Sequence, residues 1–474
     1  MKPVASCEEA TVPARGSPGA LRAAFDAGAL QRTLAWRGGT AITLAQALAE
    51  AAALAERLPS HGQPVNLCSD RYLFTLALLA ALSRGQVSLM PPNAMPHTLQ
   101  QLGDRSAPAY ALIDDAAQDT GGLPSVQVAR PTVSDAAPAL AVEPQQWVAC
   151  LLTSGSTGVP QAQRKRWDAL QQSIAAEARS LCALLDRPTI VGLNLVATVP
   201  AQHSYGFESS VLLALLGGAA FDAGRPFYPA DIADALQRLP RPRALVTTPV
   251  HLKALLLSGM ALPPVDLVLS ATAPLSPQLA QQAEARFAGR LIEIYGCTEA
   301  GQVAIRRTTA GDVWTTLDGL RIERQAGADG ERFVVSGGHV LEPTPLADQL
   351  ELIDAQHFHL LGRANDLIHV AGKRSSLAHL NFHLNRIDGV IDGAFWLPDD
   401  VADGVVRLVA FVVAPGLSAR QIVAALRPRV EGAFLPRRVV HVDALPRGPT
   451  GKITAQALRE FAMRTLGQTG RGPR

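Results

Sequence analysis

The chain has 474 residues, with 43 basic and 41 acidic side chains and a formal net charge of +2. So balanced a charge gives no sign of a basic surface, and we expect no nucleic-acid partner. The composition, 48% hydrophobic and 18% charged, excludes a disordered chain and predicts large cores. At roughly 100–200 residues per domain, two to four domains are expected.

The cysteines and the apolar stretches bear on the compartment. The five cysteines are scattered and form no CxxC pair, which argues against a disulfide framework and a structural zinc site. The polar, proline-rich start does not resemble a signal peptide. The longest apolar runs, at 73–82 and 211–220, reach roughly half of a membrane span. We therefore predict a cytoplasmic protein with no membrane span.

Strand-like and helix-like segments alternate through the first 300 residues. Helical composition at 42–58 and 72–82 flanks short apolar runs at 66–69 and 87–90, and the alternation continues to residue 295. This rhythm predicts an α/β fold, in which parallel sheets are covered by helices on both faces.

The pattern changes after about residue 300. Short strands with Gly and Asp turns predict a small β-barrel-like or meander module up to about residue 361. Strands and helices from about residue 365 predict a compact α+β domain. We expect a large N-terminal domain at 1–362 and a small α+β domain at 363–474.

Three short segments suggest phosphate chemistry. Residues 151–160, LLTSGSTGVP, follow a buried strand, and their glycines and hydroxyls could present several donors to one anion, although linkers of this composition are common. The GxxxxGK[ST] spacing of a Walker loop is absent. IYGCTE at 294–299 follows a strand, where Glu299 could hold Mg²⁺. PRGPTGKI at 446–453 places the lone Lys452 in a Pro/Gly loop; a solvated loop residue is the simpler interpretation of either segment taken alone.

Together these segments resemble the adenylate-forming (AMP-binding) superfamily of acyl- and aryl-CoA synthetases, luciferases and peptide-synthetase adenylation domains. The likeness covers nearly the whole chain. It adds PAQHSYG at 200–206, SATAPL at 270–275, and Asp348 fifteen residues before the Arg363 of LLGRANDLI. It also adds VAGKR at 370–374, so seven elements occur in one order. Their joint occurrence is far more specific than any single motif.

The resemblance implies a two-step reaction. A carboxylate attacks the α-phosphate of ATP to give an acyl-adenylate and pyrophosphate, and a thiol then displaces AMP. It implies ATP, Mg²⁺ and either coenzyme A or carrier-protein phosphopantetheine as cofactors, and a small carboxylic acid as substrate. Glu299 would hold Mg²⁺, Thr298 would contact the α-phosphate, and His203 would line the pocket near the acid. Lys452 would bridge the α-phosphate and the acid.

The resemblance also implies the remaining site residues. The β- and γ-phosphates would be held by Thr153, Ser154, Gly155, Ser156, Thr157 and Gly158. The adenosine would be bound by Ala271, Thr272, Ala273, Pro274, Tyr295, Gly296, Asp348 and Arg363. The domain at 1–362 would bind the nucleotide and the acid, and the domain at 363–474 would be a mobile lid. Asn365 would be the hinge about which this lid rotates between half-reactions, which brings Gly372 and Arg374 to the thiol tunnel.

Some residues depart from the family pattern or carry a simpler interpretation. The phosphate loop of the family usually ends in Pro-Lys, whereas residue 161 is Gln; Arg164, Lys165 or Arg166 lies close enough in sequence to compensate. Lys165 and Lys253 otherwise fall on predicted helices and are expected to be solvated. Cys297 has no neighbouring base, so it is not expected to be a nucleophile. His339, His357, His359 and His369 lack metal-ligand spacing and are expected on solvated strands.

Three functions remain open from the sequence. The first is an acid–CoA ligase, with aromatic and medium-chain acids both possible. The second is an acyl- or aryl–acyl carrier protein ligase that serves a separate carrier protein in a fatty-acid, polyketide or aryl-polyene pathway, since only 22 residues follow Lys452. The third is a degenerate nucleotide-binding scaffold without catalysis, which the loss of lysine at Gln161 would favour.

Overall fold

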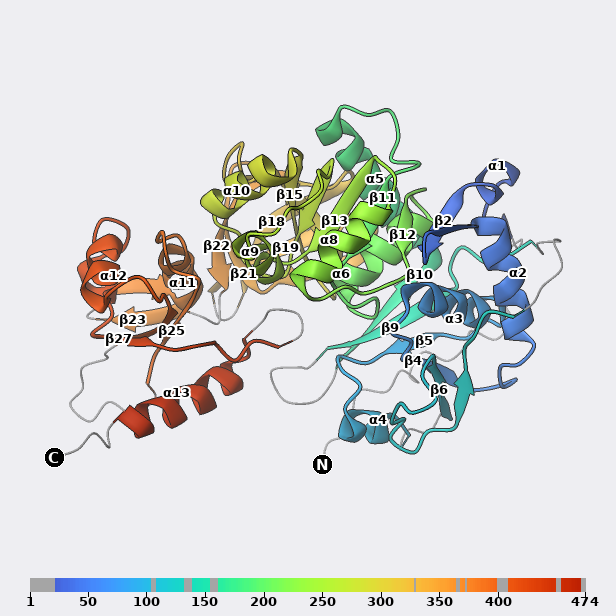
Figure 1. Cartoon of the computed structure of the whole chain (residues 1–474), viewed down its shortest axis with the longest axis horizontal. Coiled ribbons are helices and arrows are strands. Elements are labelled where there is room, and N and C mark those ends of the chain that lie inside the picture. Colours follow the sequence, from blue (N-terminus) through green and yellow to red (C-terminus); the bar gives the residue numbers. More distant parts are fainter. Residues whose placement is uncertain are drawn as a thin grey trace.

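The computed structural model describes residues 22–103, 108–131, 139–153, 161–327, 330–363, 367–370, 373–398, 408–448 and 453–469. Two large sheets with their helices form the N-terminal part, and a smaller α+β part that ends in helix α13 lies beside them (Figure 1). None of the described helices is long and apolar enough to cross a membrane.

The first sheet has six strands in the order β10-β9-β5-β4-β6-β7, and all its pairings are parallel except that of β9 with β10. Its strands are β4 (Gln63–Asn66), β5 (Ser88–Met90), β6 (Ala109–Ile113), β7 (Ser125–Gln127), β9 (Trp147–Thr153) and β10 (Gln161–Arg166). The helices that precede or follow these strands are α2 (Leu44–Ala55), α3 (Arg71–Ser83) and α4 (Pro96–Gly103). Helix α3 is apolar on all sides because it is buried almost throughout.

The second sheet has eleven strands, and part of it is parallel. The order is β21-β22-β17-β16-β15-β14-β13-β11-β12-β2-β3. The strands of the parallel part are β2 (Thr33–Arg37), β11 (Asn194–Ala197), β12 (Ala220–Asp222), β13 (Arg243–Thr247), β14 (Leu267–Ser270) and β15 (Arg290–Cys297). Its other strands are β3 (Thr40–Thr43), β16 (Gly301–Arg306), β17 (Val313–Thr316), β21 (Asp348–Leu352) and β22 (His357–Arg363). Strands β13, β14 and β15 are buried along most of their length, as expected for a sheet covered on both faces.

Helices cover both faces of this second sheet. One face packs on α8 (Pro229–Arg238), α9 (Pro249–Leu257) and α10 (Pro277–Phe287), which share one hydrophobic cluster with β13, β14 and β15. The other face packs in the main cluster with α5 (Trp167–Leu185) and with the helix formed by α6 (Ser204–Gly206), η1 (Phe207–Leu212) and α7 (Leu213–Leu215). Segment η1 is π-helical, a form that often marks a functional site.

The change of pattern after residue 300 has two structural causes. Strands β18 (Leu320–Gly327), β19 (Gly330–Gly337) and β20 (Val340–Leu346) form a three-stranded antiparallel meander. Strands β16, β17, β21 and β22 instead extend the large sheet with antiparallel pairings. The predicted α/β architecture is confirmed, and of the two forms considered for the small β module, the meander describes β18–β20.

The C-terminal part has its own hydrophobic clusters. It contains β23 (Leu367–Val370), β24 (Lys373–Ser376), α11 (Leu377–Asn385), β25 (Asp392–Trp396), β26 (Val409–Val413), α12 (Ala419–Leu426), η3 (Gly432–Phe434), β27 (Arg438–His441) and α13 (Ala455–Thr469). Two clusters, drawn from residues 368–466, include no residue of the N-terminal part. The domain boundary at residue 363 stays a prediction, with which these separate cores agree.

Lys253 joins the two parts. It lies on α9, and its ammonium donates a hydrogen bond to the backbone carbonyl of Val390 just before β25. Burial lowers the pKa of Lys253 to about 8, with Asp392 nearby opposing the shift. The expectation that Lys253 is solvated was therefore wrong.

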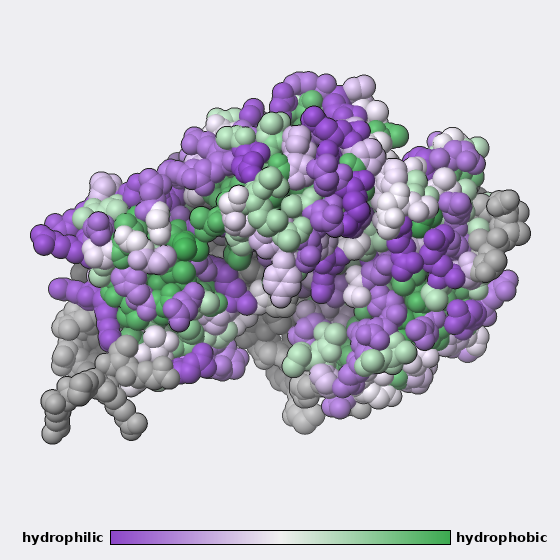
Figure 2. All heavy atoms as spheres, viewed as in Figure 1, coloured by the Kyte–Doolittle hydropathy of each residue, from purple (hydrophilic) through white to green (hydrophobic). Residues whose placement is uncertain are grey.

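Most of the face in Figure 2 is hydrophilic, and hydrophobic residues gather on the C-terminal part beside the N-terminal part.

Short elements outside these sheets complete the described chain. They are β1 (Arg22–Ala23), which pairs with β8 (Ala141–Val142), and helix α1 (Ala27–Leu30).

Candidate functional site

The segments that the sequence singles out follow neighbouring parallel strands. Strands β11, β13, β14 and β15 pair in parallel register, so their carboxyl ends lie along one edge of the sheet. The segment with His203 follows β11, Thr248 follows β13, Ala271 follows β14, and Thr298 follows β15. This edge is where ligands usually bind in open α/β sheets.

A polar cluster lies at the ends of β11 and β13. The hydroxyl oxygens of Thr198 and Thr247 are 3.0 Å apart, and Nδ1 of His251 lies 3.2 Å from the Thr198 hydroxyl. Burial lowers the pKa of His251, so its imidazole is neutral at physiological pH. His203, half-buried, is the N-cap residue of the helical segment α6, five residues after Thr198 in the chain. The arrangement offers neutral hydrogen-bonding groups rather than charges on this side of the site.

The segment expected to flank adenine is strained. Thr272 has a φ of 79°, although a β-branched side chain rarely adopts left-handed backbone geometry. Ala271 before it is buried at the end of β14. Strain of this kind persists where the surrounding structure demands it, and it gathers at ligand sites.

Tyr295 and Asp348 are brought together across the sheet. The Tyr295 hydroxyl donates a hydrogen bond of 2.9 Å to Oδ2 of Asp348. Asp348 begins β21 and stands directly opposite Arg363 in the β21–β22 register. Three residues that are far apart in sequence, and that were assigned to the adenosine, thus meet at one place.

The YGCTE turn places Glu299 toward solvent. A Cβ on Gly296 would lie 2.3 Å from the carbonyl oxygen of Gly301, so only glycine lets the chain fold back between β15 and β16. Thr298 is half-buried and Glu299 is exposed. Burial raises the pKa of Cys297 to about 12, which keeps its thiol protonated and fits the expectation that it is not a nucleophile.

Glu299 fits the expected magnesium role in one respect. Its exposed carboxylate offers a hard oxygen ligand, and among the described residues no group of three or more potential metal ligands occurs. Mg²⁺ is commonly bound through one or two carboxylates together with substrate phosphates.

Several of the predicted site residues lie outside the described residues. They are Ser154, Gly155, Ser156, Thr157, Gly158, Asn365, Gly372 and Lys452. For Thr153, Arg363 and Arg374 only the backbone is described, at the ends of β9 and β22 and within β24.

The comparison with known proteins decides the family. Residues 21–322 match the family described as AMP-binding enzyme. The chain belongs to this family.

Relatives and solved structures of AMP-binding enzymes resemble this chain over long stretches. A 4-coumarate–CoA ligase of Rhodobacter capsulatus is 32% identical over 317 residues, which are 66% of this chain and 76% of the relative. A probable nonribosomal peptide synthetase of Salinispora arenicola, CymA, is 28% identical over 87% of this chain, which is 6% of that longer protein. The solved structure of a benzoate CoA ligase from Burkholderia xenovorans superposes with a TM-score of 0.73 at 18% identity, and covers 91% of this chain and 97% of its own.

This AMP-binding enzyme is an AMP-forming acid–thiol ligase. It activates a carboxylic acid with ATP and passes the acyl group from the adenylate to a thiol. The ligase function predicted from the motifs is thereby confirmed, and the non-catalytic scaffold is not favoured.

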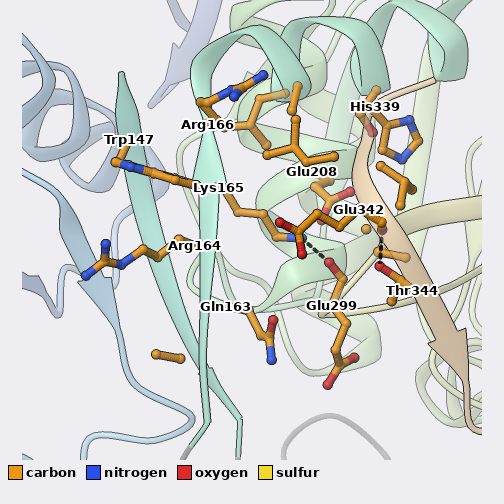
Figure 3. A pocket seen from close by; sticks show the side chains of 18 of the residues that line it. Trp147, Gln163, Arg164, Lys165, Arg166, Glu208, Glu299, His339, Glu342 and Thr344 are labelled. Atoms are coloured by element: carbon orange, nitrogen blue, oxygen red, sulfur yellow. Dashed lines mark hydrogen bonds between the residues drawn. The ribbon is translucent and has the colours of Figure 1, made fainter. Parts of the chain in front are cut away.

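Lys165 of the AMP-binding enzyme does not lie on a solvated helix, as the sequence predicted. It lies in strand β10 rather than in a helix, and its ammonium donates a 3.3 Å hydrogen bond to the backbone carbonyl of Glu299. Figure 3 shows Lys165 reaching toward Glu299, whose carboxylate points away from it, while Arg164 extends to the opposite side. The guanidinium carbon of Arg164 lies 5.9 Å from the centroid of the Trp147 ring. Arg166 is paired with Asp168 at 2.6 Å. Of the three cations considered as replacements for a lysine at residue 161, only Lys165 contacts the YGCTE turn.

We expect Lys165→Met to lower acid-dependent ATP–pyrophosphate exchange about tenfold, an effect of about 1.4 kcal/mol. The reason is that the variant would no longer bring a positive charge close to the YGCTE turn, where Thr298 is expected to contact the α-phosphate. Adding Gln161→Lys to Lys165→Met should recover most of the exchange rate, whereas Arg164→Met should leave it unchanged. If the double variant does not recover the exchange rate, Lys165 does not take the role of the family's lysine at residue 161.

A buried acidic cluster lies behind the YGCTE turn and was not anticipated. Glu208 of η1 is 2% exposed; it accepts hydrogen bonds from the Ser204 hydroxyl at 2.7 Å and from the Gln302 backbone at 3.2 Å. Glu177 of α5 is fully buried. His339, expected on a solvated strand, is 7% exposed, and burial first, then the charge of Lys165, lowers its pKa to about 4. Nothing in the sequence indicates that a glutamate on a helix, such as Glu177 or Glu208, has a buried carboxyl group.

Glu177 should make the stability of the protein depend on pH. Burial, with a smaller contribution from Glu208, raises the pKa of the Glu177 carboxyl to about 8. Between its ordinary value of 4.5 and about 8, the folded state binds more protons than the unfolded state. The free energy of unfolding therefore falls as the pH rises through this window, by about 1.4 kcal/mol per pKa unit.

The Glu177→Gln variant should not show this fall in the free energy of unfolding with rising pH. In urea unfolding at pH 5, 6.5 and 8, the stability of the variant relative to the native protein should rise steadily with pH. Glu50→Gln provides the control, because Glu50 is buried but paired with Arg130 at 2.6 Å. Parallel pH curves for the native protein and Glu177→Gln would show that this carboxyl does not hold its proton.

Proposed function

We propose that this AMP-binding enzyme activates an aromatic carboxylic acid and transfers the aryl group to coenzyme A. Support for the aromatic acid comes from relatives described as 4-coumarate–CoA ligases, of which one is 32% identical over 66% of this chain. Support for the nucleotide site comes chiefly from one contact, the hydrogen bond from Tyr295 to Asp348. The scattered cysteines support a cytoplasmic location.

The proposed site uses the edge where the parallel strands end. Asp348 would accept hydrogen bonds from the ribose hydroxyls, while Tyr295 holds its carboxylate in place and Arg363 assists. The backbone at 271–274 and the Tyr295 ring would flank adenine. The loop at 153–158 would hold the β- and γ-phosphates.

Negative charge gathers on the α- and β-phosphates in the first step, so positioning and charge neutralisation carry most of the catalysis. Mg²⁺, held by Glu299 and the phosphates, would supply part of that neutralisation when bound. Thr298 would contact the α-phosphate, and Lys452 would neutralise both reacting groups. In the second step the lid, residues 363–474, would rotate about Asn365 and replace Lys452 by Gly372 and Arg374 beside the thiol.

The acid would bind next to the polar cluster at the ends of β11 and β13. The lining proposed for it comes from residues 203–207, 247–251, 270–273 and 294–297, segments that follow or end adjacent strands. A neutral His251 and the hydroxyls around it fit an uncharged acyl or aryl group better than a second carboxylate.

A separate acyl carrier protein is the second candidate for the thiol donor. The likeness of this chain to part of a peptide synthetase favours a carrier protein as thiol donor. The likeness covers 87% of this chain and extends beyond residue 322, where the match to the family model ends. Both acceptors present the same phosphopantetheine thiol, so the chemistry of the second step is unchanged.

Two assays test the proposal. ATP–pyrophosphate exchange across benzoates, hydroxybenzoates, cinnamates and C4–C16 fatty acids should be fastest with an aromatic acid. Thioester formation, followed with coenzyme A and with holo-carrier protein in separate reactions, should be faster with coenzyme A. Exchange with fatty acids alone would overturn the aromatic assignment, and thioester on the carrier protein alone would favour the second candidate.

A further inference from the structure

A small cavity is lined by residues of the C-terminal part. It has a volume of about 150 Å³ and lies between the start of α11 and the segment that follows α12, two helices that lie side by side (Figure 1). Its polar lining consists of Ser375, His379, Arg429 and Glu431. A cavity holds a water molecule once it offers about 10–15 Å³, so this one accommodates a small polyatomic ion.

Two arginines near this cavity form no salt bridge with a carboxylate of the described residues. The exposed guanidinium of Arg429 donates a 3.1 Å hydrogen bond to the backbone carbonyl of Ala425. The guanidinium carbon of Arg386, on α11, lies 4.9 Å from the centroid of the Phe382 ring. Burial first, and then the charge of Arg429, lowers the pKa of Arg386. The two guanidiniums therefore repel each other, a cost that a bound anion would relieve.

Two histidines complete this basic cluster of His379, His383, Arg386 and Arg429. His379 and His383 lie one turn apart on α11, and their ring centroids are 4.5 Å apart. Nδ1 of His383 is buried and has no hydrogen-bond partner among the described residues. The pKa of His383 is lowered to about 4 by burial and then by the charges of the other three members of the cluster. Its imidazole is therefore neutral at physiological pH and can take up a proton when negative charge approaches.

A metal ion does not fit the basic cluster, although two histidines four residues apart on a helix can bind one. The described residues supply no third metal ligand beside them. The unpaired Nδ1 of His383 also lacks the acceptor that usually orients a metal-bound imidazole. Two guanidiniums would repel a cation, whereas the positive end of the α11 dipole, next to Ser375 and His379, favours an anion.

We propose that the basic cluster is a binding site for a divalent oxyanion, a phosphate monoester or sulfate. Arg429 and His379 line the cavity and would donate hydrogen bonds to the oxygens, while Arg386 and His383 stabilise the negative charge from behind. The inference goes beyond the proposed function, because binding of the anion requires neither the acid nor the thiol. The 3′-phosphate of coenzyme A and a free phosphorylated metabolite would present the same group to this site.

Binding of sulfate to the full chain tests the site. Isothermal titration is carried out with ATP and Mg²⁺ at saturation, so that the proposed nucleotide site is filled, and should show saturable binding at millimolar sulfate or below. Arg429→Gln should weaken this binding at least about tenfold, the loss expected for one hydrogen bond to a charged group. His379→Gln should weaken it in the same direction. Arg427→Gln is the matched control, since Arg427 is also exposed but does not line the cavity.

The two histidines should make the binding depend on pH. A dianion beside them raises their pKa, so the complex takes up protons as it forms. The affinity for sulfate, which stays doubly charged, should therefore rise as the pH falls from about 8 to about 6. The other charged groups at the cavity and the cluster are Arg386, Arg429 and Glu431. His383→Gln should make this pH dependence shallower.

Coenzyme A and its 3′-dephospho form identify the source of the anion. If Arg429→Gln raises the KM for coenzyme A in thioester formation about tenfold but leaves that for the dephospho form unchanged, the site binds the 3′-phosphate. If sulfate binding is lost while both KM values stay unchanged, the site serves a free phosphorylated metabolite.

Two results would overturn the inference. The first is the absence of saturable sulfate binding to the native protein, or equal binding to the native protein, Arg429→Gln and His379→Gln. The second is an affinity that does not change with pH, which would exclude the histidines from the site. Neither result bears on the acid or on the thiol donor, so the proposed function is tested separately.

Discussion

Lys452→Ala should lower acid-dependent ATP–pyrophosphate exchange by about 10²–10³-fold, the size typical for loss of one group that neutralises charge in a transition state. The ammonium is proposed to lie between the α-phosphate and the substrate carboxylate, two negative groups that must approach each other in the first step. Lys452 lies outside the described residues, so this role rests on its place in PRGPTGKI.

The second half-reaction provides the decisive contrast. Thioester formation from a supplied acyl-adenylate and coenzyme A should persist at close to the native rate, because the lid is proposed to have moved Lys452 away by then. Lys373→Ala, which changes the other lysine of the C-terminal part, should leave the exchange rate unchanged. Equal losses in both half-reactions would refute the assignment of Lys452 to adenylate formation.

Asp348→Ala should lower kcat/KM for ATP by at least about 100-fold. A carboxylate that pairs with ribose hydroxyls supplies charge-assisted hydrogen bonds, which are roughly twice as strong as neutral ones. Its loss would also leave the buried end of Tyr295 without its 2.9 Å partner. Initial rates of adenylate formation at varied ATP concentration measure the effect.

Tyr295→Phe is the matched control. It removes the hydrogen bond to Asp348 but keeps the ring, whose centroid lies 5.8 Å from those of Trp314 and Phe358. We expect a loss of about tenfold or less, because the carboxylate remains but is held less firmly. If the affinity for ATP is unaffected by Asp348→Ala while the protein stays folded, ribose recognition must lie elsewhere.

The fold was predictable where periodicity and burial coincide. Helix α3 is mostly apolar and is buried from Arg71 to Leu82, and the segment predicted at 72–82 differs from the observed Arg71–Ser83 by one residue at each end. Strand β10, by contrast, reads QAQRKR and has no strand-like alternation. It is a strand because it pairs with β9, a constraint imposed by tertiary structure.

Some residues of the candidate site could be predicted from a motif, and others could not. The spacing from Asp348 to Arg363 matched a known motif, and the β21–β22 register places the two residues opposite each other. Glu177 and His339 belong to no motif, and their chemistry comes from burial beside residues distant in sequence. Such groups become visible only when the chain is folded, because a glutamate in a helix is ordinarily solvated.

Helix α9 contacts both the proposed acid pocket and the C-terminal part. His251, near its start, contacts the hydroxyl of Thr198 beside the proposed acid pocket, and Lys253, two residues later, holds the carbonyl of Val390 in the C-terminal part. Asp392, close behind Val390, is paired at 2.7 Å with Arg447 in the same PRGPTGKI segment as Lys452. Any displacement of this helix by a bound acid therefore changes the free energy of docking of the C-terminal part. By thermodynamic reciprocity, the docked C-terminal part changes the affinity for the acid by the same factor.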